Sequence, residues 1–277
     1  MGNALFLDLL SYLQTVDTLY IAIAELVLVY SVVLLMFKFF GKEGIYVYVA
    51  MAYITANIQV LKMSVFAFLP EPLPLGTVVF AATYVSSDII NNRYGKKEAM
   101  KLLCIGFTSY FIFTLLMSVC LAFTPLSPEQ AASFPAGEES YGWALSMQDH
   151  MVALFSPAPS IFISSLLAFG ASQLTNILIF AKLAEKFKKR FLGLRSLCSS
   201  ITGTLVDEFV FSFMAFYFLA KDPMDIRILL GSYISCTFVI RMLIVLVEVP
   251  ILKFANTITP LGEESNQPAS KKIGYER

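Results

Sequence analysis

Two adjacent carboxylates, Asp207 and Glu208, lie in the middle of an apolar stretch of the chain. An ionised side chain at the centre of a lipid bilayer costs about 3 kcal/mol or more, so an acidic residue in an apolar segment usually has a functional partner. Helix packing explains neither carboxylate, because packing favours small residues such as glycine and serine. We therefore predict that Asp207 binds a ligand or a proton, with Glu208 beside it.

Further polar side chains recur at helical spacing in other apolar stretches. Residues three or four positions apart share one face of a helix, and three such patches are present. They are Thr83, Tyr84, Ser87, Asp88 and Asn91; Ser172, Gln173 and Asn176; and Thr55, Gln59 and Lys62, with Asn57 on a neighbouring stripe. We interpret these patches as the walls of one site that several helices share.

Some charged residues also have a purely structural interpretation. Asp88 lies near the end of its apolar stretch, where it could pair with Arg93 or Lys97 at the membrane surface. Arg241 and Glu248 are seven residues apart, which places them two turns apart on the same side of a helix. For these two we favour an ion pair that only stabilises the fold.

The motifs of several enzyme classes are missing. The sequence contains no GxxxxGK[S/T] phosphate loop, no HExxH motif and no GxSxG elbow, so we expect no enzyme activity and no cofactor. Asp88 and Asp207 could formally serve an aspartyl intramembrane protease, but Asp207 follows Gly-Thr-Leu-Val and not Gly-x-Gly. The four cysteines lie far apart, which excludes common metal-site spacings.

The composition is that of a membrane protein. Hydrophobic residues make up 57% of the 277 residues and charged residues 14%, against about 25% charged residues in soluble domains. A membrane-spanning helix needs about 20 apolar residues. The sequence therefore predicts an all-α, polytopic protein with a bundle of about seven transmembrane helices, at residues 19–38, 44–69, 75–92, 98–123, 158–182, 197–219 and 228–252.

Basic residues predict how the chain is oriented. Most of the 20 lysines and arginines follow the first, third, fifth or last segment, and basic residues mark cytoplasmic loops. We expect a multi-pass protein of the cytoplasmic (inner) membrane, its basic loops contacting membrane lipids. Its expected parts are an external N-terminus (1–18), a transmembrane domain (19–255) and a cytoplasmic tail (256–277). The external loop 124–157 is expected to contain a short interfacial helix near Tyr141 and Trp143. The net charge of zero argues against nucleic-acid binding.

Four stretches carry motifs of one known family. Ala56 to Lys62 is similar to Ala-Asn-Ile-x-x-x-Lys, and Ser87-Asp88-Ile89 with Tyr94 to Ala99 is similar to Thr-Asp-Ile followed by Tyr-Gly-Lys-Lys-Glu-Ala. Ser172 to Leu174 and Leu194 to Asp207 match two further blocks. In these motifs, from about Leu28 to Phe254, the chain resembles the queuosine precursor transporter family, also called the vitamin uptake transporter (VUT) family.

The resemblance implies import of a 7-deazaguanine, which is queuine or its cyano- or aminomethyl-bearing precursor. It implies a six-helix core to which the first segment is added. A carboxylate can accept hydrogen bonds from the N1–H and the exocyclic amine of such a base, and aromatic rings can stack on it. The implied substrate-binding residues are Asn57, Lys62, Tyr84, Asp88, Gln173, Asn176, Thr204, Asp207, Glu208 and Phe213.

The chain departs from the family pattern at three of these positions. Asn176 stands where the family has Asp, Thr204 where it has Gln or Asn, and Glu208 where it has Ser or Thr. We expect that one carboxylate has moved across the same cavity, from position 176 to position 208.

Two other functions stay open at the level of sequence. The chain could be a substrate-binding membrane subunit that needs a separate energising ATPase, docked on the basic cytoplasmic face. It could also be an intramembrane hydrolase, in which case loss of Asp88 or Asp207 would abolish product formation and not substrate binding. The sequence also leaves open whether the protein forms a homodimer.

Overall fold

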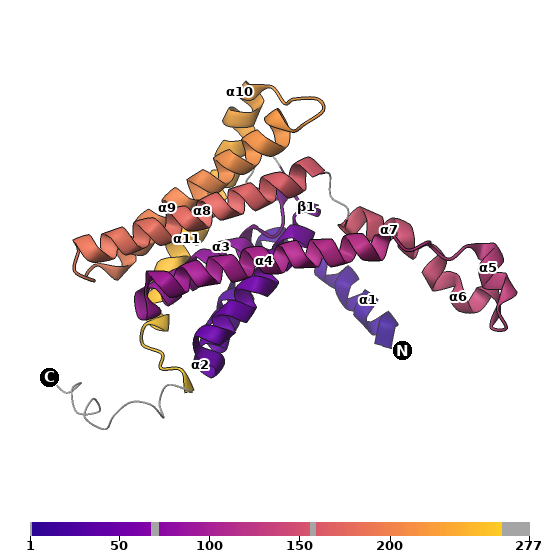
Figure 1. The fold of residues 1–277 in the computed structure, drawn as a ribbon, viewed down its shortest axis with the longest axis horizontal. Helices are drawn as coiled ribbons and strands as arrows, with labels where there is room; N and C mark the ends of the chain where they lie inside the picture. The colour runs from indigo at the N-terminus through magenta and orange to yellow at the C-terminus, as the bar shows by residue number, and fades with distance from the viewer. Residues whose placement is uncertain (1, 68–71, 156–158, 262–277) are drawn as a thin grey trace.

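The structure is a computed structural model, and it describes residues 2–67, 72–155 and 159–261. Over these residues the fold is an all-α bundle with one short hairpin of two strands, β1 and β2 (Figure 1). The described elements are α1 (Gly2–Leu13), α2 (Thr18–Gln59), β1 (Met63–Ser64), β2 (Leu73–Pro74), α3 (Thr77–Tyr94), α4 (Lys96–Leu121), α5 (Pro128–Ser133), α6 (Gly137–Leu145), α7 (Met147–Phe155), α8 (Pro159–Lys186), α9 (Leu192–Phe213), α10 (Ile226–Ile228) and α11 (Ser235–Ala255). Two π-helical segments, Met214–Phe218 and Leu229–Ile234, extend α9 and precede α11.

Helix α2 folds back on itself at Gly41. The backbone of this residue is non-helical and has a positive φ, a conformation that glycine adopts at no steric cost. The side-chain amide of Gln59 donates a hydrogen bond to the Glu25 carboxylate (3.2 Å), so the two halves of α2 run antiparallel. A Cβ on Gly44 would lie 2.2 Å from the Met36 carbonyl oxygen, which shows how closely the halves approach. The predicted break between the first two segments is therefore confirmed.

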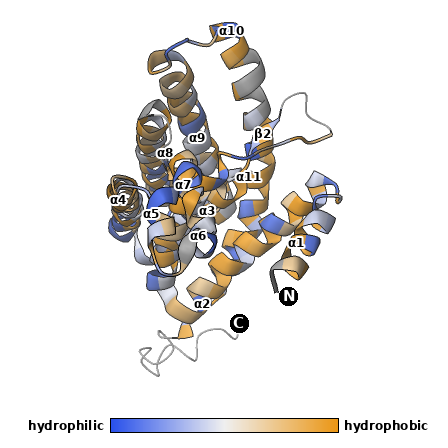
Figure 2. Ribbon diagram, turned by 90° about the vertical axis from the view of Figure 1, so that its right-hand side faces the viewer, coloured by the Kyte–Doolittle hydropathy of each residue, from blue (hydrophilic) through white to orange (hydrophobic). Residues whose placement is uncertain are grey.

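The protein is an all-α, multi-pass membrane protein. Four helices of the described chain, α2, α4, the Ile161–Lys186 part of α8, and α9 with its π-helical extension, are long and apolar enough to cross a membrane. Apolar residues cover most of α2 (Figure 2). With the two halves of α2, the bundle contains helical segments near all seven predicted positions, whereas the number of membrane crossings stays a prediction.

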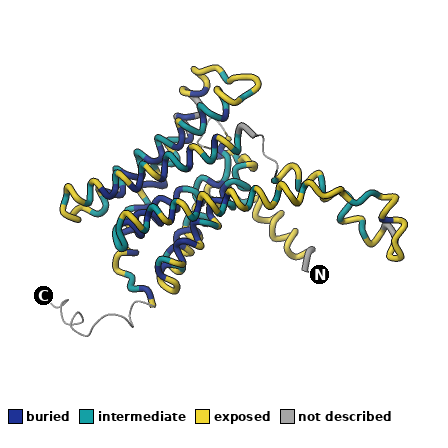
Figure 3. The backbone as a smooth tube through the Cα atoms, in the orientation of Figure 1, coloured by how far each residue is buried: buried dark blue, intermediate teal, exposed yellow. Residues whose placement is uncertain are grey.

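Helix α3 is at the centre of the bundle. Its residues from Ala81 to Asn91 are all buried, and it contacts α2, α4, α8, α9 and α11. This burial explains how a helix with Thr83, Ser87 and Asp88 exists in a membrane protein, because these side chains face protein and not lipid. Buried residues follow the inner helices in Figure 3, whereas α1 and the α5–α7 segment are largely exposed.

One predicted boundary was wrong, and the structure adds short helices that the sequence did not predict. The second segment ends at Gln59 and not at residue 69, because the backbone of Met63 and Ser64 pairs with Leu73 and Pro74 in the β1–β2 hairpin instead of continuing the helix. Helix α6 contains Tyr141 and Trp143 and confirms the short helix expected there, and α5 and α7 are additional short helices on either side of it. The N-terminal residues form α1, which the sequence did not predict.

Close packing of α4 against α2 predicts a stability effect. A Cβ on Gly106 would lie 2.4 Å from Cε2 of the buried Tyr53 ring, so Gly106→Ala forces that ring to move. We expect a loss of about 1–3 kcal/mol in the free energy of unfolding. The measurement is the thermal unfolding midpoint of the purified protein in detergent. The control is Gly170→Ala on α8, whose Cβ has nothing within 4 Å; an equal loss in both variants would contradict this packing.

Candidate functional site

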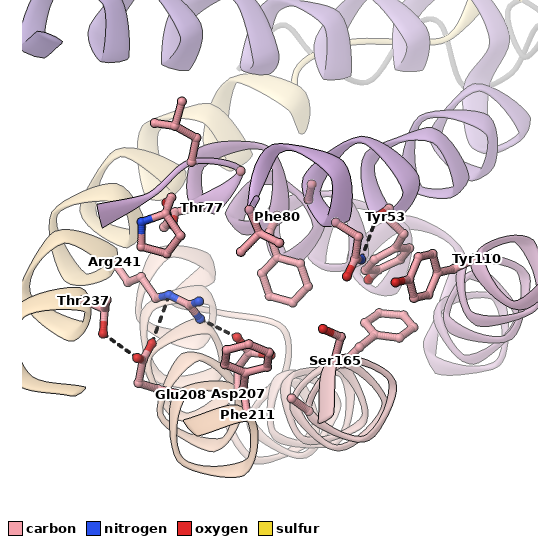
Figure 4. Close-up of a pocket in the computed structure, with 18 residues that line it drawn as sticks. Tyr53, Thr77, Phe80, Tyr110, Ser165, Asp207, Glu208, Phe211, Thr237 and Arg241 are labelled. Carbon is pink, nitrogen blue, oxygen red and sulfur yellow. Dashed lines mark hydrogen bonds and ion pairs between the residues drawn. The ribbon is translucent and has the colours of Figure 1, made fainter. Parts of the chain in front are cut away.

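An ionic cluster joins α9 and α11 at the wall of a cavity (Figure 4). Arg241 forms an ion pair with Asp207, and its Nε lies 3.2 Å from Oε2 of Glu208. The hydroxyl of Thr237 donates a hydrogen bond to Glu208, and the Ser172 hydroxyl on α8 donates one to Asp207 (3.4 Å). Both carboxylates are buried, and one guanidinium contacts both of them.

Helix geometry explains why these side chains converge. Thr237 and Arg241 are four residues apart on α11, so both face α9. Asp207 and Glu208 are successive residues of α9 and point in directions about 100° apart. Asp207 therefore contacts Ser172 on α8 as well as Arg241 on α11, whereas Glu208 contacts Thr237 and Arg241, which are both on α11.

The cavity beside this cluster has a volume of about 90 Å³, and five aromatic residues are among those that line it. It lies between the second half of α2, the start of α3, the middle of α4, α8, α9 and α11. The residues that line it are Tyr53, Ala56, Asn57, Val60, Pro74, Leu75, Gly76, Thr77, Phe80, Tyr110, Ser165, Ala168, Phe169, Asp207, Glu208, Phe211, Thr237 and Arg241. The cavity therefore brings aromatic rings and the charged cluster together in one place.

Gly76 shapes the rim of the cavity. It has a positive φ, and a Cβ there would lie 2.6 Å from the carbonyl oxygen of Ala56. Other residues rarely adopt this backbone conformation. The turn before α3 can therefore pack directly on the end of α2.

The predicted site residues divide into four groups. Asn57, Asp207 and Glu208 line the cavity. Behind the cavity wall, the Gln173 amide donates a hydrogen bond to the Thr83 hydroxyl (2.8 Å), and Tyr84 and Thr204 are buried nearby on α3 and α9.

The third group lies deeper in the bundle. The Asn176 amide donates a hydrogen bond to Asp88 (3.1 Å), and neither residue lines the cavity. Asp88 is fully buried, so the interpretation that it pairs with Arg93 or Lys97 at the membrane surface was wrong. Asn176 and Glu208 belong to different clusters, and the relocation of a carboxylate across one cavity is not supported.

Two predicted residues lie away from the cavity. Lys62 is exposed, because α2 ends at Gln59 and the helical face that would have carried Lys62 does not continue. The ring of Phe213 stacks on the exposed Phe209 (6.1 Å between centroids), whereas Phe211 contributes the α9 ring that lines the cavity.

The sequence also assigned Arg241 to the wrong partner. It was expected to pair with Glu248, two turns further along its own helix, but it pairs with Asp207 and Glu208 on α9. Spacing within α11 contains no signal for this contact. The only hint was that a buried arginine and a pair of buried carboxylates need partners of opposite charge.

One family model and one curated relative match the chain over most of its length. Residues 74–255 match the model of a family described as "Putative vitamin uptake transporter". The chain belongs to this family. The match includes α3, α4, α8, α9 and α11, and therefore both sides of the Arg241 cluster. No solved structure matches the chain.

A curated relative of this chain comes from Bacillus subtilis (strain 168). It is named "Probable queuosine precursor transporter" and is 29% identical over 239 residues, which cover 86% of this chain and 94% of the relative. The similarity therefore extends beyond the family match into α2, which contributes Asn57 and Tyr53 to the cavity.

Proposed function

We propose that this protein imports a queuosine precursor, a 7-deazaguanine, across the cytoplasmic membrane for tRNA modification. The observation that carries the proposal is the Asp207–Arg241–Glu208 cluster at the edge of an aromatic cavity, in a member of a transporter family. The name of the Bacillus relative supplies the substrate class.

The cavity chemistry suits a 7-deazaguanine. A carboxylate of the cluster can accept hydrogen bonds from the N1–H and the exocyclic amine of the base, while the Arg241 guanidinium can donate one to the adjacent carbonyl. Phe80, Phe169 and Phe211 offer faces for stacking, which contributes about 1–3 kcal/mol per base in nucleic-acid complexes. An analogue that lacks one donor would leave a buried carboxylate oxygen unpaired and bind much more weakly.

The place of the cavity suits import. Basic residues are concentrated near the turn at Gly41 and in the α8–α9 turn, and the positive-inside rule assigns such turns to the cytoplasm. The β1–β2 hairpin, at the opposite end of the second half of α2, is then on the external side. The cavity is lined by Pro74 to Thr77, next to that hairpin, so in this orientation it lies toward the external side. The N-terminus is then external and the C-terminus cytoplasmic.

The charge of the cluster predicts which precursor is preferred. Two carboxylates and one guanidinium leave a net charge of −1 at the cavity. A substrate with a protonated amine gains from this charge, so we expect the aminomethyl precursor to compete at least about 10-fold better than the neutral cyano precursor, a difference of about 1.4 kcal/mol. Competition against labelled substrate measures it. Glu208→Gln, which leaves the cluster neutral, should remove the preference; a preference that survives it would contradict this origin.

The experiment that tests the proposal uses the purified protein alone. Reconstituted into liposomes without ATP or any other protein, it should take up labelled 7-deazaguanines faster than protein-free liposomes. Uptake only after an ATPase is added would show that the chain is a substrate-binding subunit. Absence of both binding and uptake for every 7-deazaguanine would overturn the proposal.

A further inference from the structure

A second buried polar cluster lies on the cytoplasmic side of the cavity. Its carboxylates are Asp88 on α3 and Glu248 on α11, both fully buried. Glu248 follows Arg241 on α11 and lies two helical turns nearer to the cytoplasmic end. The serine hydroxyls of α9 that face these carboxylates, Ser196 and Ser200, are likewise fully buried.

Glu248 has no cationic partner among the described residues. Neither of its carboxylate oxygens makes a hydrogen bond of standard geometry, although the Ser200 hydroxyl lies beside it. The titratable groups that face it from the packed helices are Asp88 and Tyr84 on α3 and Tyr30 on α2, none of which is a cation. A buried carboxylate without a cation is costly to ionise, so Glu248 gains from binding a proton.

Asp88 differs from Glu248 because a guanidinium is close to it. The guanidinium of Arg195 on α9 is near enough to Asp88 for the two charges to attract each other. Arg195 also donates a hydrogen bond to Asn92 (2.6 Å) at the cytoplasmic end of α3. The Asn176 amide also donates to Asp88. With both acids ionised, the cluster has a net charge of −1, which one added proton neutralises.

These surroundings favour a proton over a metal cation. A metal ion needs several oxygen ligands around it, whereas a proton needs one carboxylate oxygen. The Asn176 amide donates an N–H group to Asp88, and the Arg195 guanidinium adds a positive charge near it. An N–H donor and a positive charge both disfavour a metal cation at this position.

Tyr84 connects this cluster with the cavity. Its side chain is buried, and the charges of Asp207, Arg241 and Glu248 all act on its hydroxyl group. A substrate that changes the charge balance at Asp207 therefore changes the field at Glu248. Ionisable groups that follow one another through the membrane in this way are typical of proton relays.

We propose that Glu248, with Asp88 below it, forms a proton-binding site that couples import of the substrate to proton influx. The proposal rests on the proposed function. The Glu248 carboxylate takes up a proton from the external side and releases it to the cytoplasm by way of Asp88, so one proton enters with each substrate molecule and no covalent bond other than O–H changes.

The test is uptake by the reconstituted protein under imposed ion gradients. With one pH unit across the membrane (acidic outside), the wild type should accumulate the aminomethyl precursor up to about tenfold, which is the roughly 1.4 kcal/mol that the gradient supplies. Glu248→Gln should keep substrate binding and substrate exchange, but lose accumulation. Glu248→Asp should keep part of it. Glu25→Gln, a carboxylate of α2 outside this cluster, is the matched control and should accumulate like the wild type.

The outcomes separate the two proposals. A wild type that neither binds nor takes up any 7-deazaguanine refutes the proposed function itself. A wild type that transports but ignores the pH gradient, or follows a sodium gradient instead, overturns proton coupling. Accumulation by Glu248→Gln at the wild-type level also overturns it. If folded Glu248→Gln protein loses both substrate binding and accumulation, Glu248 has a structural role, and proton coupling is overturned as well.

Discussion

Asp207→Asn should lower the rate of precursor uptake at least about 30-fold. Truncating one charge of a buried, hydrogen-bonded pair costs about 2–5 kcal/mol, and about 2 kcal/mol corresponds to that factor. Asp207 pairs with Arg241 and accepts a hydrogen bond from Ser172, and it also faces the cavity, so the amide loses both the ion pair and the acceptor offered to the substrate. The measurement is the initial rate of labelled precursor uptake.

The control for this variant is Asp222→Asn. Asp222 is exposed in the turn between α9 and α10, so the same chemical change should leave uptake within about twofold. Wild-type uptake by Asp207→Asn, with equal amounts of both proteins in the membrane, would remove Asp207 from the substrate site.

Arg241→Gln should both destabilise the protein and abolish uptake. The substitution leaves Asp207 and Glu208 buried as adjacent carboxylates without a cation, and breaking a buried pair in this way costs about 3–5 kcal/mol. We expect a lower thermal unfolding midpoint in detergent and no uptake above background. The matched control, Arg227→Gln at an exposed position in α10, should change neither.

A second substitution tests whether charge balance is the cause. Arg241→Gln combined with Glu208→Gln returns the cluster to a net charge of −1, so the double variant should be more stable than Arg241→Gln alone. The interaction energy between contacting charges is expected to exceed about 1 kcal/mol. Strictly additive effects would show that Arg241 and Glu208 act independently.

The sequence was sufficient for the fold class and most helix positions. Apolar stretches of about 20 residues specify membrane helices, because inside a bilayer the backbone N–H and C=O groups must hydrogen-bond to each other and a helix satisfies them all within one segment. The end of α2 was predicted wrongly because apolar residues continue past Gln59, where the chain enters the β1–β2 hairpin instead. Consequently Lys62 was placed on a helical face that does not exist.

Contacts between helices were harder to predict than the helices themselves. Asp207 and Glu208 were singled out because a carboxylate in an apolar segment is costly, and the structure places both at the cavity. Their partner Arg241 was missed because spacing within one helix says nothing about which face of another helix it meets. For the same reason Asp88 and Asn176, which were expected at the substrate site, lie in a separate cluster.

Rescue of queuosine in tRNA tests import of a queuosine precursor most directly. The host is a bacterium that lacks queuosine precursor synthesis and its own importer, but keeps the enzymes that use the precursor supplied. Each 7-deazaguanine is fed separately at low concentration, and modified tRNA is detected by its shift on a boronate-affinity gel. We expect modified tRNA with the wild type and not with Asp207→Asn. Unmodified tRNA with every precursor, from protein shown to be in the membrane, would contradict import by this chain.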